Sequence, residues 1–307
     1  MRRSIRSFIV ALVVLGLPAG AGEALAKMRV VASTPELKSL TEAVGGDLAD
    51  VEALARGNQN FHDVEVRPSL MVKLRRADVL IANGLDLDFW VDALVQGSHN
   101  PRLLSGGSGR VDASQGVRVL EVPTGRIDRS LGDVHAQGNP HYTHDPASAE
   151  VVTANIVDGL ARAAPEHRAA FERRRQQFLA RLNEAQARWL RVLEPFRGAR
   201  VVVNHNSWIY FLSRFGLSQI GTVEDRPGIP PSPAHLANLI RQMREASVKV
   251  LILEPWGDRR LAERVAAEAG ARVVVLAHTV GALKGIDSYL DMFEHNVNRL
   301  AEALRTR

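Results

Sequence analysis

Residues 248–278 read VKVLILEPWGDRRLAERVAAEAGARVVVLAH, and this stretch decides the fold class. It begins with a short aliphatic run, continues with a charged segment of helical pattern, and ends with a second β-branched run. Strands that alternate with helices of this length are typical of parallel βαβ units, because a parallel strand pair needs a long crossover connection. The stretch therefore predicts an α/β fold with a parallel sheet.

The same alternation extends in both directions along the chain. After residue 199, the predicted strands ARVVV and LSQIGTV alternate with the predicted helices SWIYFLSRFG and SPAHLANLIRQMREA. Near the N-terminus, the strands MRVVAST and ADVLIANG alternate with the helices PELKSLTEAV and PSLMVKLRRA. A chain of 307 residues with 46% apolar side chains is long enough for two lobes. We expect two α/β lobes with parallel sheets, formed by residues 27–164 and 197–307.

Residues 165–196 between these sets predict one long helix. The segment contains no glycine, and its apolar residues recur at steps of three and four, namely Phe171, Phe178, Leu182, Ala185, Trp189 and Leu193. A helix of this length would extend about 45 Å. An ordinary long helix within one domain is an alternative, but the position between two βα sets favours a rigid strut that joins the lobes.

The first 26 residues are typical of a cleaved secretory signal peptide. Three arginines precede the apolar run FIVALVVLGLPAGAG, and ALA at 24–26 provides the small residues of a cleavage site. A membrane anchor is the alternative, although the run is shorter than the roughly 18 to 20 residues that span a bilayer. We therefore expect a periplasmic protein.

Charge and cysteine content limit the partners. Cleavage would remove three arginines and one glutamate and lower the formal charge from +5 to +3. No stretch combines clustered basic residues with aromatic ones, so nucleic acid is not an expected partner. The chain has no cysteine, so a metal site must use nitrogen and oxygen ligands.

Several of the ten histidines follow predicted strands. His205 and His278 come directly after such runs, His62 precedes a helix, and His141 lies in the turn GNPHYTHDP at 138–146. Ligands in open α/β sheets gather at the carboxyl ends of the strands, so these four side chains are candidates to converge between the lobes. Neutral imidazoles suit a borderline divalent metal such as zinc.

Enzyme signatures are missing from the sequence. There is no H-E-x-x-H helix, no G-x-S-x-G elbow, no Walker loop and no dinucleotide fingerprint after a strand. We expect no enzyme, and a secreted zinc hydrolase with Glu254 as general base stays the alternative of a different class. Glu254 could instead orient a metal-binding histidine or simply contact main-chain N–H groups.

Five segments together resemble the periplasmic zinc- and manganese-binding proteins of ABC importers. They are NFHDVEVRPSLMVKLRRADVLIANGLDLDFWVDAL, GNPHYTHDP, VVVNHNSWIYFLSRFGL, PPSPAHLANLIRQMREASVKVLILE and DSYLDMFEHNVNRLAEAL. The resemblance implies two α/β lobes joined by one long helix, with the metal in the cleft and His62, His141 and His205 as ligands. Manganese-binding members tend to carry glutamate where this chain has His205, so three imidazoles favour Zn(II) as the cargo, with Mn(II) as the alternative.

The fourth ligand departs from the family pattern, in which an aspartate shortly follows the last strand. Here that neighbourhood reads LAHTVGALKGIDSY, and His278 is the donor nearest to the expected place. We predict His278 as the fourth metal ligand and Asp287 as a helix cap, with Asp287 as ligand, or water, as the alternatives. His135 and His144 are candidates for transient ligands or for solvated loop residues.

The resemblance also implies the partners. We expect a monomer that delivers its metal to an ABC transporter permease, with a metallochaperone as a candidate that loads the site. Because the strut helix is long and lacks glycine, we expect little lobe movement when the metal leaves.

Overall fold

The computed structural model describes residues 27–125, 135–226 and 228–305. The predicted signal peptide and part of the loop before GNPHYTHDP lie outside these residues. The described chain contains two four-stranded sheets, and every strand pair in both is parallel. The prediction of an α/β fold with parallel sheets is therefore confirmed.

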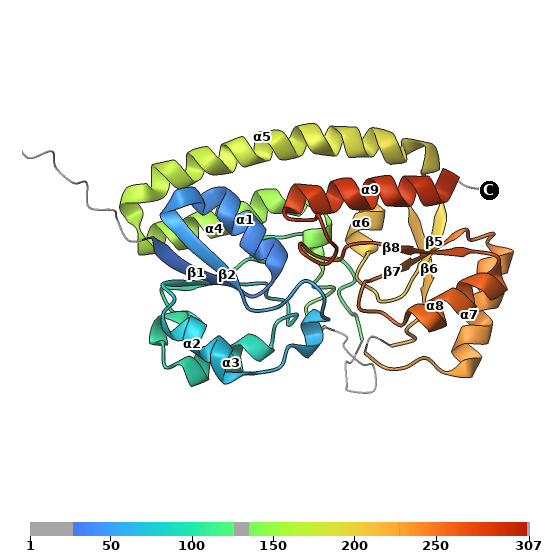
Figure 1. Ribbon diagram of the computed structural model, residues 1–307, viewed down its shortest axis with the longest axis horizontal. Coiled ribbons are helices and arrows are strands. Elements are labelled where there is room, and N and C mark those ends of the chain that lie inside the picture. The colour runs from blue at the N-terminus through green and yellow to red at the C-terminus, as the bar shows by residue number, and fades with distance from the viewer. Residues whose placement is uncertain (1–26, 126–134, 227, 306–307) are drawn as a thin grey trace, which may run out of the picture.

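The first sheet has the strand order β2-β1-β3-β4. Its strands are β1 (Met28–Ala32), β2 (Ala49–Ala53), β3 (Val79–Ala82) and β4 (Arg110–Asp112). Helices α1 (Pro35–Gly45) and α4 (Ala149–Ala163) cover one face, and α2 (Pro68–Arg75) and α3 (Trp90–Ser98) cover the other (Figure 1). Successive residues of β1 follow this arrangement, since Val30 belongs to the cluster beneath α1 and Val31 to the cluster beneath α2 and α3.

The second sheet repeats the design with the order β6-β5-β7-β8. Its strands are β5 (Arg200–Val203), β6 (Ser218–Thr222), β7 (Val250–Leu253) and β8 (Arg272–Val275). Helices α7 (Pro233–Glu245) and α8 (Arg259–Ala269) cover the outer face. The short helix α6 (Ile209–Arg214) and the last helix α9 (Tyr289–Arg305) cover the other face (Figure 1).

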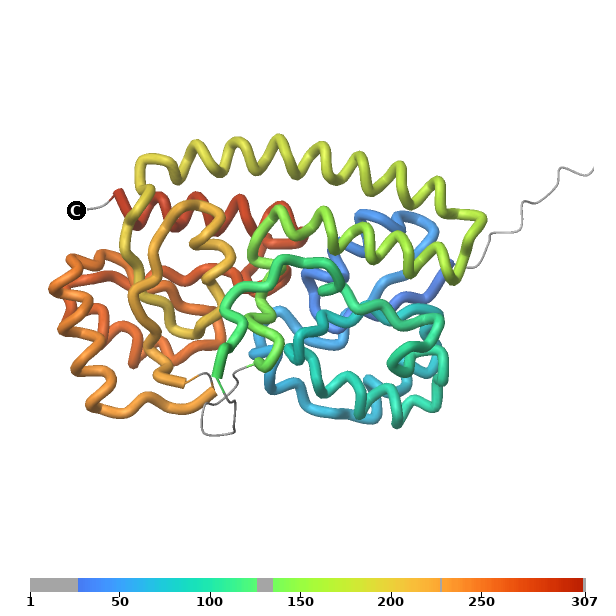
Figure 2. Tube along the Cα trace, turned by 180° about the vertical axis from the view of Figure 1, so that it is seen from behind, coloured from blue at the N-terminus to red at the C-terminus, as the bar shows by residue number. Residues whose placement is uncertain are grey.

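The predicted strut is helix α5 (Arg168–Leu193), which short 3-10 turns extend at both ends to residues 165 and 196. Its buried residues are the six of the predicted stripe: Phe171, Phe178, Leu182, Ala185, Trp189 and Leu193. Figures 1 and 2 both show α5 running across the two lobes with α9 beside it. Trp189 stacks on Phe293 of α9 and donates its indole N–H to Glu294 at 2.7 Å.

One apolar cluster continues from the first lobe through the α5 and α9 faces into the second lobe. The exact division of the chain at residues 164 and 197 stays a prediction, because this cluster belongs to both halves. Among the described residues, none of the helices is both long and apolar enough to cross a membrane.

Candidate metal centre

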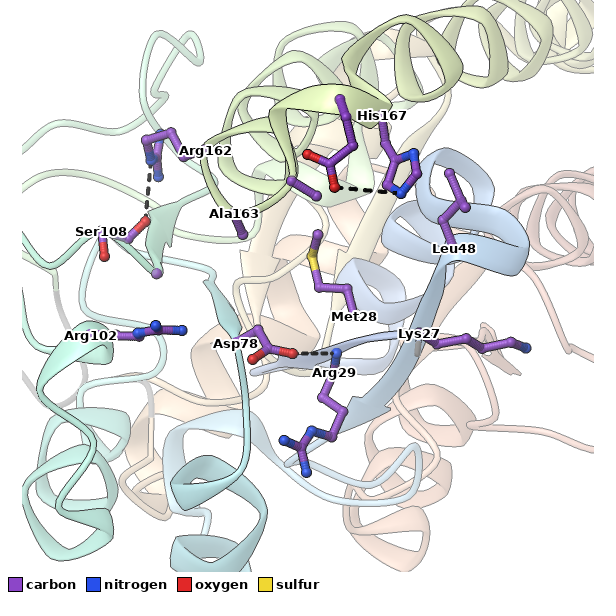
Figure 3. Close-up of a pocket in the computed structure, with 13 residues that line it drawn as sticks. Lys27, Met28, Arg29, Leu48, Asp78, Arg102, Ser108, Arg162, Ala163 and His167 are labelled. Atoms are coloured by element: carbon purple, nitrogen blue, oxygen red, sulfur yellow. Dashed lines mark hydrogen bonds and ion pairs between the residues drawn. The ribbon is translucent and has the colours of Figure 1, made fainter. Parts of the chain in front are cut away.

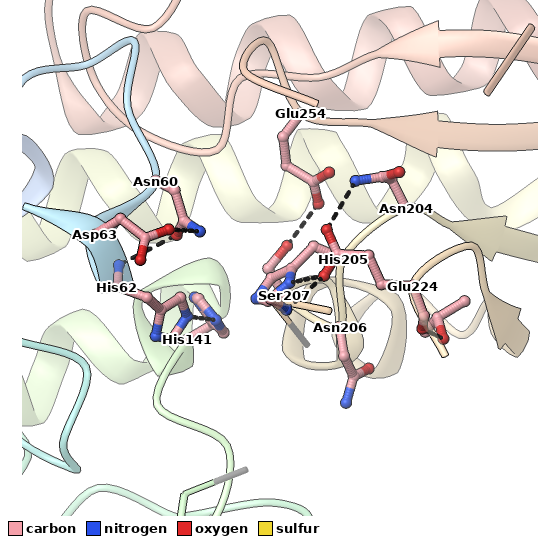
Figure 4. A network of polar contacts seen from close by, with 12 residues as sticks. Asn60, His62, Asp63, His141, Asn204, His205, Asn206, Ser207, Glu224 and Glu254 are labelled. Carbon is pink, nitrogen blue, oxygen red and sulfur yellow. Dashed lines mark hydrogen bonds and ion pairs between the residues drawn. The ribbon is translucent and has the colours of Figure 1, made fainter. Parts of the chain in front are cut away.

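Three histidines from three separate loops meet between the lobes. His62 lies in a 3-10 turn after β2, His141 lies in the loop after β4, and His205 lies two residues beyond β5. One ring nitrogen of each lies within 4.8 Å of one ring nitrogen of the other two. The three loops leave the same edge of their sheets, which is the edge where parallel strands end (Figure 4).

The spacing of these nitrogens suits a tetrahedral ion. The Nε2 atoms of His62 and His141 lie 3.4 Å apart. Two ligands on a tetrahedral zinc with Zn–N bonds of 2.0–2.1 Å stand roughly 3.3–3.4 Å apart. The two rings are thus already at the separation that a shared zinc ion requires.

The surroundings keep these imidazoles in the form that binds metal. Burial lowers the pKa of His62 well below its ordinary value, and the neighbouring histidines lower it further. The same two causes, desolvation first, lower the pKa of His141. A metal competes with protons for imidazole nitrogen, so a lowered pKa favours binding.

A carboxylate that the sequence analysis missed contacts His205. Glu224, two residues beyond β6, accepts a hydrogen bond from Nδ1 of His205 over 2.8 Å. The position of Glu224 in the sequence was the one feature that could have indicated this contact. Glu224 follows β6, which pairs with β5, so the residues after both strands lie at the same edge of the sheet. Glu254 does not orient His205; it accepts hydrogen bonds from the Ser207 hydroxyl at 2.8 Å and the Trp208 indole at 2.7 Å.

His278 lies beside the three histidines but outside their group. Its Nε2 is 3.2 Å from the carbonyl oxygen of Gln59, and its Nδ1 is buried without a partner. It lines a small buried cavity together with His141 and His205, and burial lowers its pKa to about 3. Its role as the fourth ligand stays a prediction.

Asp287 is exposed, and helix α9 begins two residues later. The hydroxyl of Ser288 accepts the main-chain N–H of Asp291 at 3.2 Å. The prediction that Asp287 caps the helix was therefore wrong, because α9 begins at Tyr289 and the residue in the capping position directly before it is Ser288.

His144 joins the two lobes and is not a solvated loop residue. Its ring nitrogens lie 2.8 Å from the carbonyl oxygen of Ser207 and 2.7 Å from that of His278, and its ring stacks on Trp208. Burial lowers its pKa, which these carbonyl groups oppose. The ring centroid of His135 lies 5.0 Å from that of His62, and burial lowers the pKa of His135 to about 4. A transient role for His135 stays a prediction.

The turn at 138–146 is held by both lobes. Tyr142 donates its hydroxyl to the carbonyl of Asn83 in the first lobe, and Tyr210 in the second lobe donates to the carbonyl of Asn139, each at 2.7 Å. Gly138 has φ +104°, and a Cβ there would lie 2.5 Å from a side-chain carbon of Val119. The glycine therefore allows the tight turn that presents His141.

A larger hollow of about 840 Å³ has none of the three clustered histidines in its lining (Figure 3). Its lining includes Lys27 and Arg29 at the start of β1, Asp78 just before β3, Arg102 in a 3-10 turn and Arg162 near the end of α4. Arg162 already donates to the carbonyl oxygens of Ser108 and Arg110. The candidate metal centre is instead at the opposite edge of the sheet, where the hollow is small and bounded by imidazoles.

A family model described as "Zinc-uptake complex component A periplasmic", ZnuA, matches residues 30–303. The chain belongs to this ZnuA family. It is 23% identical over 286 residues to the high-affinity zinc uptake system protein ZnuA of Bacillus subtilis, covering 91% of this chain and 88% of the relative.

Solved structures of ZnuA-like proteins have the same fold as this chain. The zinc-bound crystal structure of a ZnuA deletion mutant superposes with a TM-score of 0.77 and 25% identity, covering 92% of this chain and 99% of the other. A manganese-bound mutant of a periplasmic metal-binding protein from Candidatus Liberibacter asiaticus gives a TM-score of 0.76 at 20% identity, covering 91% and 100%. The ZnuA-like fold thus accompanies both metals in solved structures.

Proposed function

We propose that this ZnuA family member captures Zn(II) in the periplasm with His62, His141 and His205 and delivers it to an ABC permease. The observation that carries the proposal is the 3.4 Å between the Nε2 atoms of His62 and His141, with His205 completing the group. Nitrogen ligands favour zinc over manganese, which prefers oxygen. A manganese receptor of the same family is the second candidate.

His278 is our proposal for the fourth ligand. Its Nδ1 is buried without a partner, and it lines the same cavity as His141 and His205. A rotation of the ring away from Gln59 would give the ion a fourth nitrogen. Water or Asp287 would replace it if the ring stays on Gln59.

A zinc hydrolase receives no support from Glu254. Burial raises the pKa of this carboxyl group, and one of its oxygens already accepts two hydrogen bonds. A general base must be ionised and within reach of a water or substrate proton. We therefore propose that the bound metal is cargo and that no reaction is performed on it.

Zinc titration of the chelator-stripped protein tests the proposal. We expect one zinc ion per chain by elemental analysis and preference for zinc when Zn(II) and Mn(II) compete. Each of His62→Ala, His141→Ala and His205→Ala should weaken binding at least about 10-fold, whereas His99→Asn, which replaces an exposed histidine at φ +56°, serves as the matched control. Preference for manganese would support the second candidate.

Delivery is tested in cells that lack the gene and are starved of zinc. The wild-type gene should restore growth, and the His205→Ala gene should not. Equal growth with either gene would contradict a role of this site in uptake.

A further inference from the structure

His205 differs from His62 in what its second ring nitrogen contacts. Nδ1 of His205 donates to Oε2 of Glu224 over 2.8 Å, whereas Nδ1 of His62 is buried without a partner. A carboxylate can only accept a hydrogen bond, so the proton of neutral His205 stays on Nδ1. In this tautomer the lone pair of the His205 ring is on Nε2.

Glu224 is held in place by the residues around it. Its Oε1 accepts from the Asn204 side chain at 3.4 Å, and its Oε2 also accepts from the main-chain N–H of Gly228 at 3.2 Å. The main chain of Glu224 bonds to Asn204, which follows β5 and precedes His205. Both the carboxylate and the imidazole are therefore fixed by the same end of the second sheet (Figure 4).

The segment that carries Glu224 is anchored at a second point. The ring of His235, in α7, lies 2.9 Å from the carbonyl oxygen of Thr222 through Nε2 and 3.3 Å from the carboxylate of Asp225 through Nδ1. The ring therefore holds the main chain at Thr222 and the side chain at Asp225, on either side of Glu224.

We propose that Glu224 is the positioning residue of the metal site, which sets the tautomer of His205 and strengthens it as a zinc ligand. This inference rests on the proposed function. A carboxylate on the distal nitrogen raises the basicity of a ligating imidazole and fixes the orientation of its ring. The carboxylate of Glu224 also places a negative charge next to the His205 ring, one imidazole away from the metal dication. The atoms that bind the metal are still neutral nitrogens.

The test compares Glu224→Gln, Glu224→Ala and Glu245→Gln with the wild type and with His205→Ala. Glutamine at 224 keeps an acceptor for Nδ1 but removes the charge, and alanine removes both. Glu245→Gln removes an exposed carboxylate at the end of α7 instead and serves as the control. Zinc affinity is measured by chelator competition. We expect Glu224→Gln to weaken binding about 10-fold and Glu224→Ala about 100-fold, with Glu245→Gln close to the wild type.

Cobalt(II) absorption separates positioning from a merely structural role. If Glu224 orients His205, the ligand-field bands of the Co(II) protein should shift in Glu224→Ala, although thermal unfolding of the zinc-free variant matches the wild type. Wild-type zinc affinity and unchanged cobalt bands in both Glu224 variants, while His205→Ala loses affinity, would overturn this inference alone. Undiminished affinity in His205→Ala would refute the proposed function and this inference together.

Discussion

Acid should destabilise the zinc-free protein, because its buried histidines cannot take up protons until it unfolds. Burial lowers the native pKa of six described histidines below the ordinary value of 6.5; they are His62, His135, His141, His144, His278 and the partly buried His295. A group whose pKa is lower in the folded state binds more protons in the unfolded state below pH 6.5. The stability that it contributes is therefore lost as the pH falls through that value.

His278 allows the magnitude to be worked out, since its native pKa is about 3. Between pH 7 and 5.5 the protonated fraction of a histidine in the unfolded chain rises from about 0.24 to about 0.91. The native state takes up almost no proton at His278 over this range. Integrating the difference gives a loss of about 1.3 kcal/mol from this one residue.

The variant His278→Gln isolates this contribution. Burial raises the pKa of Glu36 and Glu254, so acid acts on these groups with the opposite sign, but they are present in both proteins and cancel in the comparison. The free energy of unfolding is measured by urea denaturation at pH 7 and pH 5.5. We expect the acid-induced loss to be smaller in the variant by about 1.3 kcal/mol, and equal losses in both proteins would refute the reasoning.

Three further results are expected. His278→Ala should weaken zinc binding at least about 10-fold in chelator competition, and Asp287→Asn should not; the reverse pattern would give the fourth position to Asp287. Small-angle scattering profiles of zinc-free and zinc-bound protein should superimpose, because Arg214 and Asp145 form an ion pair between the lobes with two contacts of 2.6 and 2.7 Å. A large compaction on adding zinc would contradict this expectation. Phe178→Ala should lower the free energy of unfolding by about 3–5 kcal/mol in urea denaturation, because this side chain of α5 is buried. A loss below about 1 kcal/mol would show that the surrounding side chains fill the cavity.

The long helix and the parallel sheets could be predicted because their signals are local and repeated. The six buried residues of α5 follow from spacing alone, since an amphipathic helix must bury its apolar stripe. The rule that parallel strands end at one edge of a sheet predicted that His62, His141, His205 and His278 converge, and the family resemblance selected the first three, which the structure brings together. Neither inference needs the identity of any particular tertiary neighbour.

The contacts of individual polar side chains could not be predicted in the same way. Glu224 and Glu254 both follow strands beside β5, and the sequence offers no reason to choose between them as the partner of His205. The partner of His205 is the carboxylate whose loop approaches Nδ1. The loop of Glu224 is held there by the main-chain N–H of Gly228, which donates to Glu224, and by the contact of His235 with Thr222. His144 likewise reads as a loop residue until the second lobe supplies two carbonyl groups for it.

The turn at 138–146 is rich in polar residues because it has two roles. It presents His141 to the ion, and it also carries the groups that bind both lobes, through Tyr142 to the first and through Asn139 and His144 to the second. A wide opening of the lobes would break these buried bonds together, and each buried polar group left unpaired costs roughly 1–3 kcal/mol. His62 is different, because its turn follows a short loop of the first lobe and its own Nδ1 makes no bond. We therefore expect metal release to begin with movement of the His62 turn, while His141 and His205 keep their mutual positions.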